Sequence, residues 1–213
     1  MTTIKHILTF CLLLLAHHLF AQQKTGSFQW ESGDLIFQNL DCGDMCDAIE
    51  AVTQGYQGQK FSHVGLVNRM GKTVMVIEAV GAGVRMIPLD SFVKRTPNKM
   101  YVGRVKKEYT RFIKKAIRFS VQQIGKPYDD AFIYGNGKYY CSELIYDAFQ
   151  YANHGKPFFQ LEPMTFKKPG SDDYFPVWVS YYEKLHMPIP EGKPGCNPGG
   201  LSRSEKIEIV KEL

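Results

Sequence analysis

The chain contains a cysteine, a histidine and a glutamate at positions that could form a site for nucleophilic catalysis. Cys141 stands in "KYYCSELIYDAF" (138–149), between a Gly/Tyr-rich loop and an amphipathic helix. At the first turn of a helix, the free N–H groups and the helix dipole favour a thiolate. His63 beside this thiol would be a general base and acid, and Glu78 would hold the imidazole in one tautomer. The alternative is structural: a packed cysteine, a hydrogen-bonded histidine and an ion pair.

The neighbourhood of His63 and Glu78 follows from a predicted β-hairpin. The segments "SHVGLVNR" and "TVMVIEAV" alternate as strands on either side of a turn at Met70-Gly71. An even loop centred between these two turn residues places His63 directly opposite Glu78. It also sets Arg69 against Lys72 if the loop has two residues. Side chains directly opposite share one face, with Cβ atoms roughly 4.5–5.5 Å apart.

The surroundings of this pair also favour a site. Glu78 shares its face of the strand with valines only, so its carboxylate needs a partner or becomes neutral. Gly65 follows His63 on the same face and leaves room for a close approach. We therefore expect the Cys141 helix to dock its N-terminus on that face.

Tyr128 in "GKPYDDAF" precedes Cys141 on a loop marked by Gly and Pro. Its hydroxyl could donate a hydrogen bond to a developing oxyanion, or the ring could simply pack beside the helix. The neighbouring Asp129 and Asp130 are interpreted as turn or capping residues. Tyr139 and Tyr140 are candidates for the pocket wall.

The remaining elements must position these residues. Further strands are predicted at 33–40, 83–89 and 99–106, and helical segments at 44–53, 90–95, 109–125, the Cys141 region and 179–186. In the segment 109–125 the apolar residues keep helical period: they are Phe112, Ile113, Ala116, Ile117, Val121 and Ile124. The end of the chain is rich in Gly and Pro and is interpreted as a loop. Strands followed by helices indicate an α+β fold, an antiparallel sheet or small barrel packed against helices.

The N-terminus resembles a secretory signal peptide. Lys5 precedes an apolar run from Ile7 to Ala16, and Ala21 offers a cleavage point, so residues 1–21 are assigned to the signal. The run is too short to span a bilayer in the mature protein. Residues 22–213 are predicted to form one domain, exported to the periplasm or secreted and without a membrane span. A formal charge of +5, carried by scattered basic residues, does not favour nucleic-acid binding.

Four cysteines remain in the predicted mature chain. Cys42 and Cys46 could form a local disulfide in an oxidising compartment or remain a packed pair of thiols. Cys196 lies in the Gly/Pro-rich tail. Because no His/Cys cluster has zinc-site spacing, the sequence predicts neither a metal centre nor a cofactor.

The ordered motifs "GDLIF", "FSHVGLV", "VIEAV", "GKPYD" and "YYCSELIYDAF" resemble the circularly permuted NlpC-type papain-like family, the YiiX/YaeF group. In this branch the histidine strand precedes the cysteine helix, as it does here. The resemblance spans nearly the whole predicted mature chain, including the tail "PGCNPGGLSRS". It implies Cys141 as nucleophile, His63 as base, Glu78 as the orienting residue and Tyr128 near the oxyanion.

The resemblance implies a cysteine amidase or peptidase, and a thiolate that attacks a carbonyl carbon would act through a thioester intermediate. Related NlpC-type enzymes cut the peptide stems of cell-wall peptidoglycan, and the predicted export fits that substrate. The permuted branch also resembles lipid acyltransferases and phospholipases, and aromatic residues after Cys141 could line an acyl pocket. A third alternative is a non-catalytic module that binds a peptide or lipid. A monomer is expected.

Overall fold

The computed structural model describes residues 28–213, so the predicted signal peptide at 1–21 lies outside the described residues. One sheet of six strands, all paired antiparallel, organises these residues in the order β4-β3-β2-β1-β5-β8. The strands are β1 (Leu35–Gln38), β2 (His63–Met70), β3 (Thr73–Val80), β4 (Gly83–Pro88), β5 (Tyr101–Val105) and β8 (Ile207–Glu212). The predicted antiparallel sheet packed against helices is confirmed. The barrel alternative is wrong, because no pairing among the described residues closes β4 onto β8.

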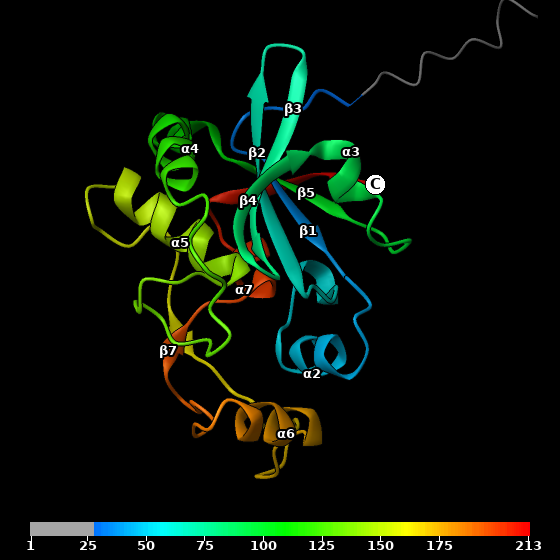
Figure 1. The fold of residues 1–213 in the computed structure, drawn as a ribbon. Coiled ribbons are helices and arrows are strands. Elements are labelled where there is room, and N and C mark those ends of the chain that lie inside the picture. Colours follow the sequence, from blue (N-terminus) through cyan, green and yellow to red (C-terminus); the bar gives the residue numbers. More distant parts are fainter. Residues whose placement is uncertain (1–27) are drawn as a thin grey trace, which may run out of the picture.

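Helices lie on both sides of the sheet and beyond one of its ends (Figure 1). The helices are α2 (Asp44–Val52), α3 (Leu89–Val93), α4 (Ile113–Gln122), α5 (Cys141–Ala152), α6 (Pro176–Lys184) and α7 (Pro198–Ser202), with short 3-10 helices at Tyr56–Gly58 and Lys107–Phe112. A small second sheet pairs β6 (Glu162–Pro163) with β7 (Pro194–Gly195). None of the helices in 28–213 is long and apolar enough to cross a membrane.

Alternation along β1 shows how the sheet is buried on both faces. Leu35 and Phe37 join the core that contains the inner side of α5, whereas Ile36 packs with Phe92 of α3. On β2, Val64 and Leu66 face the α5 core, and Val67 lies on the α3 side. Because side chains alternate along a strand, His63 and Gly65 belong to the α3 face.

This arrangement corrects the predicted docking of the cysteine helix. Most of α5 packs on the opposite face, where Leu144 contacts the core around Ile77 and Ala79. The space above Gly65 is filled by α3 instead, since a Cβ there would lie 2.6 Å from Phe92 Cε2. Cys141 reaches His63 only because it opens α5 at the end of the sheet where β2 begins.

The predicted hairpin forms, but in a different register. Met70 pairs with Thr73 and Leu66 with Ile77, so the two-residue turn is Gly71-Lys72. In this register Glu78 falls opposite Gly65, one step along the same face from His63. The prediction that His63 stands directly opposite Glu78 is therefore wrong, as is the pairing of Arg69 with Lys72, because Arg69 pairs with Val74. Gly71 has φ of 63°, which a glycine adopts without strain.

Two further differences concern the helix at 109–125 and the tail. The helix is shorter than predicted, since α4 ends at Gln122, and Val121 and Ile124 are exposed rather than inward. The tail contributes the edge strand β8, which pairs with β5 and was not predicted.

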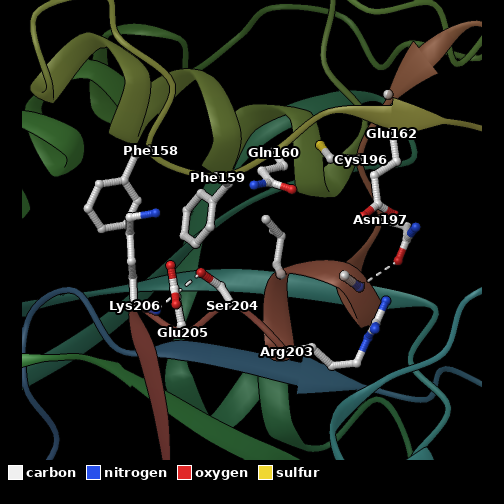
Figure 2. A pocket seen from close by; sticks show the side chains of 13 residues that line it. Phe158, Phe159, Gln160, Glu162, Cys196, Asn197, Arg203, Ser204, Glu205 and Lys206 are labelled. Atoms are coloured by element: carbon white, nitrogen blue, oxygen red, sulfur yellow. Dashed lines mark hydrogen bonds between the residues drawn. The ribbon is translucent and has the colours of Figure 1, made fainter.

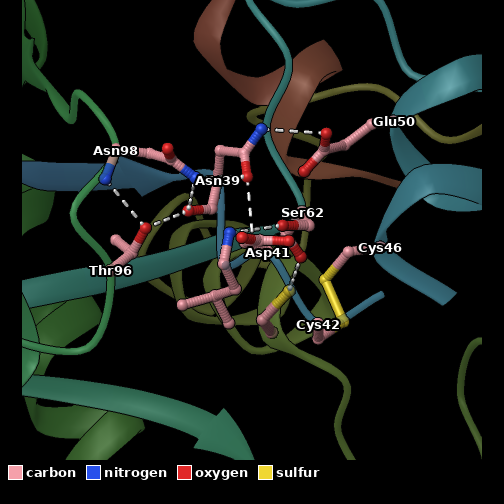
Figure 3. Close-up of a disulfide and its surroundings, with 10 residues drawn as sticks. Asn39, Asp41, Cys42, Cys46, Glu50, Ser62, Thr96 and Asn98 are labelled. Carbon is pink, nitrogen blue, oxygen red and sulfur yellow. Dashed lines mark hydrogen bonds between the residues drawn. A yellow bond between two sulfur atoms is a disulfide. The ribbon is translucent and has the colours of Figure 1, made fainter. Parts of the chain in front are cut away.

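Cys42 and Cys46 form a disulfide in the structure, which resolves the two alternatives left open by their spacing. The bond closes the first turn of α2 beside a polar network that includes Asn39 and Ser62 (Figure 3). Asn39 donates to the buried Glu50 on the same helix at 2.9 Å. The hydrogen bond ties α2 to the loop that follows β1, and Gln38 at the end of β1 pairs with His63.

Candidate active site

His63 and Glu78 form a buried pair at the start of β2. His63 Nε2 lies 2.7 Å from Glu78 Oε2, and the two side chains are 3% and 0% exposed. The ring of His63 packs near Phe92, with centroids 5.8 Å apart. Because Nε2 is engaged by the carboxylate, Nδ1 is the nitrogen left for the thiol.

Two arginines complete the environment of Glu78, and neither was predicted from the sequence. Arg95 Nη2 donates to Glu78 Oε2 at 2.6 Å, and Arg85 Nε donates to Oε1 at 2.9 Å. The guanidinium of Arg95 also lies over the Phe92 ring, 4.5 Å from its centroid. A buried carboxylate held by an imidazole and two guanidinium groups stays ionised and cannot rotate freely.

The pKa values of the pair move in opposite directions. Burial raises the pKa of Glu78, but the hydrogen bond to His63 and the charges of His63 and Arg95 outweigh it and lower this pKa from 4.5 to about 2. Burial lowers the pKa of His63, but hydrogen bonds to Cys141 and Glu78 and the charges of these groups outweigh it, so the pKa lies above 6.5. The pair therefore favours an imidazolium beside a carboxylate.

We expect the contribution of the His63–Glu78 pair to the free energy of unfolding to be largest between pH 4.5 and pH 6.5. The lowered pKa of Glu78 stabilises the fold above pH 4.5, and roughly 3 kcal/mol is lost as the pH falls toward 2. The raised pKa of His63 stabilises the fold below pH 6.5, and this contribution disappears as the pH rises through the folded pKa. Urea unfolding across this range measures the effect. An acid slope that is the same in wild type and Glu78→Gln would contradict the assignment to Glu78.

Cys141 is the first residue of α5 and is 6% exposed. Its Sγ lies 4.0 Å from the carbonyl oxygen of Ser62, the residue before His63. The neighbouring Cys141 thiol contributes to the raised pKa of the histidine. The structure thus brings Cys141, His63 and Glu78 together in the order thiol, imidazole, carboxylate.

A cleft of about 140 Å³, named the catalytic cleft for the role proposed below, opens over Cys141. Its walls come from α2, from the loop before α5, from β6 and the residues after it, from α6 and from the tail. Its aromatic lining includes Tyr128, Phe132, Tyr140, Phe166 and Trp178. Tyr128 is half-buried, and its hydroxyl makes no hydrogen bond within residues 28–213. Burial and the charge of Cys141 raise the pKa of Tyr128 well above its usual value, so the phenol keeps its proton. Tyr128 is therefore an unengaged donor beside the thiol.

Of the other residues near Cys141 in the sequence, Tyr139 lies away from the cleft and Asp129 is a turn residue. Tyr139 is buried in the core near Ile77, so it does not line the cleft, whereas Tyr140 does. Asp129 is buried and accepts from the N–H groups of Ala131 and Ile133, as expected for a turn residue.

The tail is bonded to both residues that flank the thiol, a feature that the sequence did not reveal. Ser142 Oγ donates to the carbonyl oxygen of Cys196 at 2.9 Å. The N–H of Cys196 donates to the hydroxyl of Tyr140 at 3.1 Å. These two bonds, the tail lock, hold the segment at Cys196 against the first turn of α5. Cys196 is a second free cysteine of the cleft, and burial raises the pKa of its thiol.

The loop before α5 is fixed by Glu143, another buried residue of the first turn. Its carboxylate accepts from the N–H of Gly135 at 2.9 Å and from the N–H of Tyr140 at 3.4 Å. Burial and the charges of Asp129 and Asp147 raise the pKa of Glu143 to about 8. The side chain caps the helix that carries Cys141.

A family model described as "Permuted papain-like amidase enzyme, YaeF/YiiX, C92 family" matches residues 29–211. The chain belongs to this family. The predicted resemblance to permuted papain-like enzymes is thereby confirmed. The cysteine helix that follows the histidine strand in this chain agrees with the permuted order.

Two relatives of the permuted papain-like amidase family can be compared directly. The chain is 29% identical over 134 residues to "Uncharacterized protein YiiX" of Escherichia coli strain K12, a match that covers 59% of this chain and 61% of YiiX. The similarity thus spans less than two thirds of that relative. The crystal structure of "metalloprotein yiiX from Escherichia coli O157:H7" superimposes with a TM-score of 0.70 at 25% identity, and the match covers 87% of this chain and 99% of the other.

Proposed function

We propose that the protein is an exported cysteine amidase or peptidase that cleaves an amide bond through Cys141, His63 and Glu78. The observation that carries the proposal is the buried histidine that bonds Glu78 through Nε2 at 2.7 Å and whose pKa is raised by the neighbouring Cys141 and Glu78. Membership in an amidase family supports the reaction class. The disulfide in α2 supports export, since such bonds persist in oxidising compartments. The destination, periplasmic or secreted, remains part of the proposal.

The reaction proceeds in two halves. His63 takes the proton of Cys141, and the thiolate attacks the carbonyl carbon to form a tetrahedral oxyanion. The oxyanion collapses to a thioester as the C–N bond breaks, and the imidazolium gives its proton to the leaving amine. Water then attacks the thioester while His63 takes one of its protons. The C–S bond breaks, and the sulfur recovers the proton as the carboxylic acid leaves. Glu78 stabilises the imidazolium in both halves without changing its protonation.

Tyr128→Phe tests whether the Tyr128 hydroxyl stabilises the oxyanion of this mechanism. The free hydroxyl would donate to the oxyanion, which forms only during the reaction. We expect kcat to fall about 10²-fold with little change in KM. Steady-state kinetics of the variant measure this, with Tyr139→Phe as a matched control because that phenol lies in the core. A drop in kcat of the same size in both variants would contradict the assigned role.

The relative of known structure is titled a metalloprotein. Within residues 28–213, no group of three or more His, Cys, Asp or Glu side chains converges as metal ligands would. In the site itself, Glu78 is already held by two arginines. The donor set does not fit a metal centre, and we derive no step through one.

A peptide is the first candidate substrate, and the stem peptides of the cell wall are accessible to an exported enzyme. The aromatic lining of the catalytic cleft favours a second candidate, a lipid ester or amide whose acyl chain would occupy it. Hydrolysis of matched N-acyl amides and short peptides separates the two. A lipid enzyme would gain rate with acyl length, whereas a peptidase would not.

Labelling with iodoacetamide between pH 5 and pH 8 tests the proposal without knowledge of the substrate. We expect rapid labelling of Cys141 at low pH in wild type and slow labelling in His63→Ala, read by mass spectrometry. Cys196 is an internal control, because burial raises the pKa of its thiol. Labelling of Cys141 no faster than that of a free cysteine would favour a non-catalytic binding module.

A further inference from the structure

A second cavity of about 310 Å³, the tail cavity, adjoins the catalytic cleft and is larger than it. Figure 2 shows it between the segment from Phe158 to Glu162 and the tail from Cys196 to Lys206. Glu162, Cys196 and Asn197 line both spaces, so a substrate could extend from one into the other.

The position of the tail cavity relative to the thiol is fixed by the tail lock. Cys196 lies on the boundary of the two spaces and is bonded to Tyr140 and Ser142, the residues on either side of Cys141. The tail cavity therefore stands at a constant place with respect to the reacting sulfur, as a substrate subsite must.

The walls of this cavity carry charges of both signs that are not neutralised by ion pairs. Glu162, Arg203, Glu205 and Lys206 all line it, and within residues 28–213 none of the four forms an ion pair. Arg203 uses Nε to bind the carbonyl oxygen of Gln54 at 2.7 Å, which leaves its terminal N–H groups for a ligand. The ammonium of Lys206 lies 5.4 Å from the centre of the Phe158 ring.

We propose that the tail cavity is a substrate subsite for a peptide segment that carries both acidic and basic groups. This inference rests on the proposed function and narrows it. The two cations would bind carboxylates, and the two carboxylates would bind ammonium groups. A fatty acyl chain would gain nothing from these four side chains and would strip water from them.

The test measures binding, so it does not depend on turnover. Calorimetric titration of the Cys141→Ala protein would use the tetrapeptide Gly-Glu-Lys-Gly with free ends. The comparison ligands are its acetylated and amidated Gly-Gln-Gln-Gly analogue and a decanoyl amide. We expect the charged peptide to bind at least tenfold more tightly than the neutral one and to weaken as salt is added.

Second substitutions, added to the Cys141→Ala protein, test whether the charged peptide binds in the tail cavity. Arg203→Gln and Lys206→Gln should each lose roughly 5-fold in affinity for the charged peptide and little for the neutral one. Lys168→Gln, which changes an exposed lysine outside the cavity, is the matched control. Equal affinity for the two peptides, tighter binding of the decanoyl amide, or equal losses in all three variants would overturn the inference. Failure of the proposed function would instead appear as an unreactive Cys141 in wild type.

Discussion

Replacing Cys141 by alanine will abolish amide hydrolysis, with kcat/KM falling by about 10³-fold or more. Without the sulfur no thioester can form, and His63 has no nucleophile to activate. The change removes only one buried atom from the core, so the free energy of unfolding should fall by about 1 kcal/mol. Hydrolysis rates and urea unfolding of the purified variant measure both quantities.

Cys196→Ala is the control for this experiment, because it removes the other free thiol of the same cleft. The tail lock uses the backbone N–H and carbonyl of Cys196, so it survives the substitution. We expect a change in kcat/KM of less than about tenfold. Loss of activity in Cys196→Ala with retention in Cys141→Ala would reverse the assignment of the nucleophile.

Replacing Glu78 by glutamine will lower kcat/KM by about 10²-fold or more. The carboxylate only accepts a hydrogen bond from Nε2 of His63, which leaves Nδ1 for the thiol. An amide can donate to Nε2 and so stabilise the wrong tautomer. The loss of negative charge also lowers the pKa of His63, so the acidic limb of the pH–rate profile should move to lower pH.

The same variant leaves two arginines without their anion and should unfold more easily by about 3 kcal/mol. Arg85→Gln separates this effect from catalysis, because Arg85 is 50% exposed and touches Oε1, not the oxygen that binds His63. We expect less than a tenfold loss in kcat/KM for Arg85→Gln and no shift of the acidic limb. An unshifted pH–rate profile in Glu78→Gln would mean that the carboxylate does not orient the histidine.

The meeting of His63 with Glu78 could be predicted although the hairpin register was wrong. A shift of the turn by one residue changes the partner of Glu78 from His63 to Gly65, but it keeps all three residues on the same face. A histidine and a carboxylate are long enough to bridge that diagonal. A one-residue shift of the turn therefore leaves the predicted sheet face of a residue unchanged, whereas it changes the predicted cross-strand partner.

Arg85 could have been found by the same reasoning, since the next hairpin pairs it with Glu78 around the Gly81-Ala82 turn. Arg95 could not, because it follows a short helix in a loop and no periodicity places its guanidinium. The face of the sheet on which α5 packs could not be predicted from the sequence pattern either. Both faces of the central strands are apolar, so either could accept the helix.

The edge strand β8 was missed because it follows a tail rich in Gly and Pro. Its alternation of Ile207 and Ile209 with charged neighbours is typical of a half-buried strand but is short. The tail lock depends on contacts far apart in the sequence, and a Tyr hydroxyl bonded to a backbone N–H leaves no sequence signal.

The tail lock also determines when, during synthesis, the site can be completed. Cys196 reaches Tyr140 and Ser142 only after the segment behind it has left the ribosome, and β8 is the last strand to be made. A chain ended after Pro190 should therefore label at Cys141 more slowly than the full chain, because the first turn of α5 has lost both bonds to the tail. An unfinished polypeptide would carry His63, Glu78 and Cys141 without the two bonds from Cys196, so the first turn of α5 gains its last support only when the tail has been made.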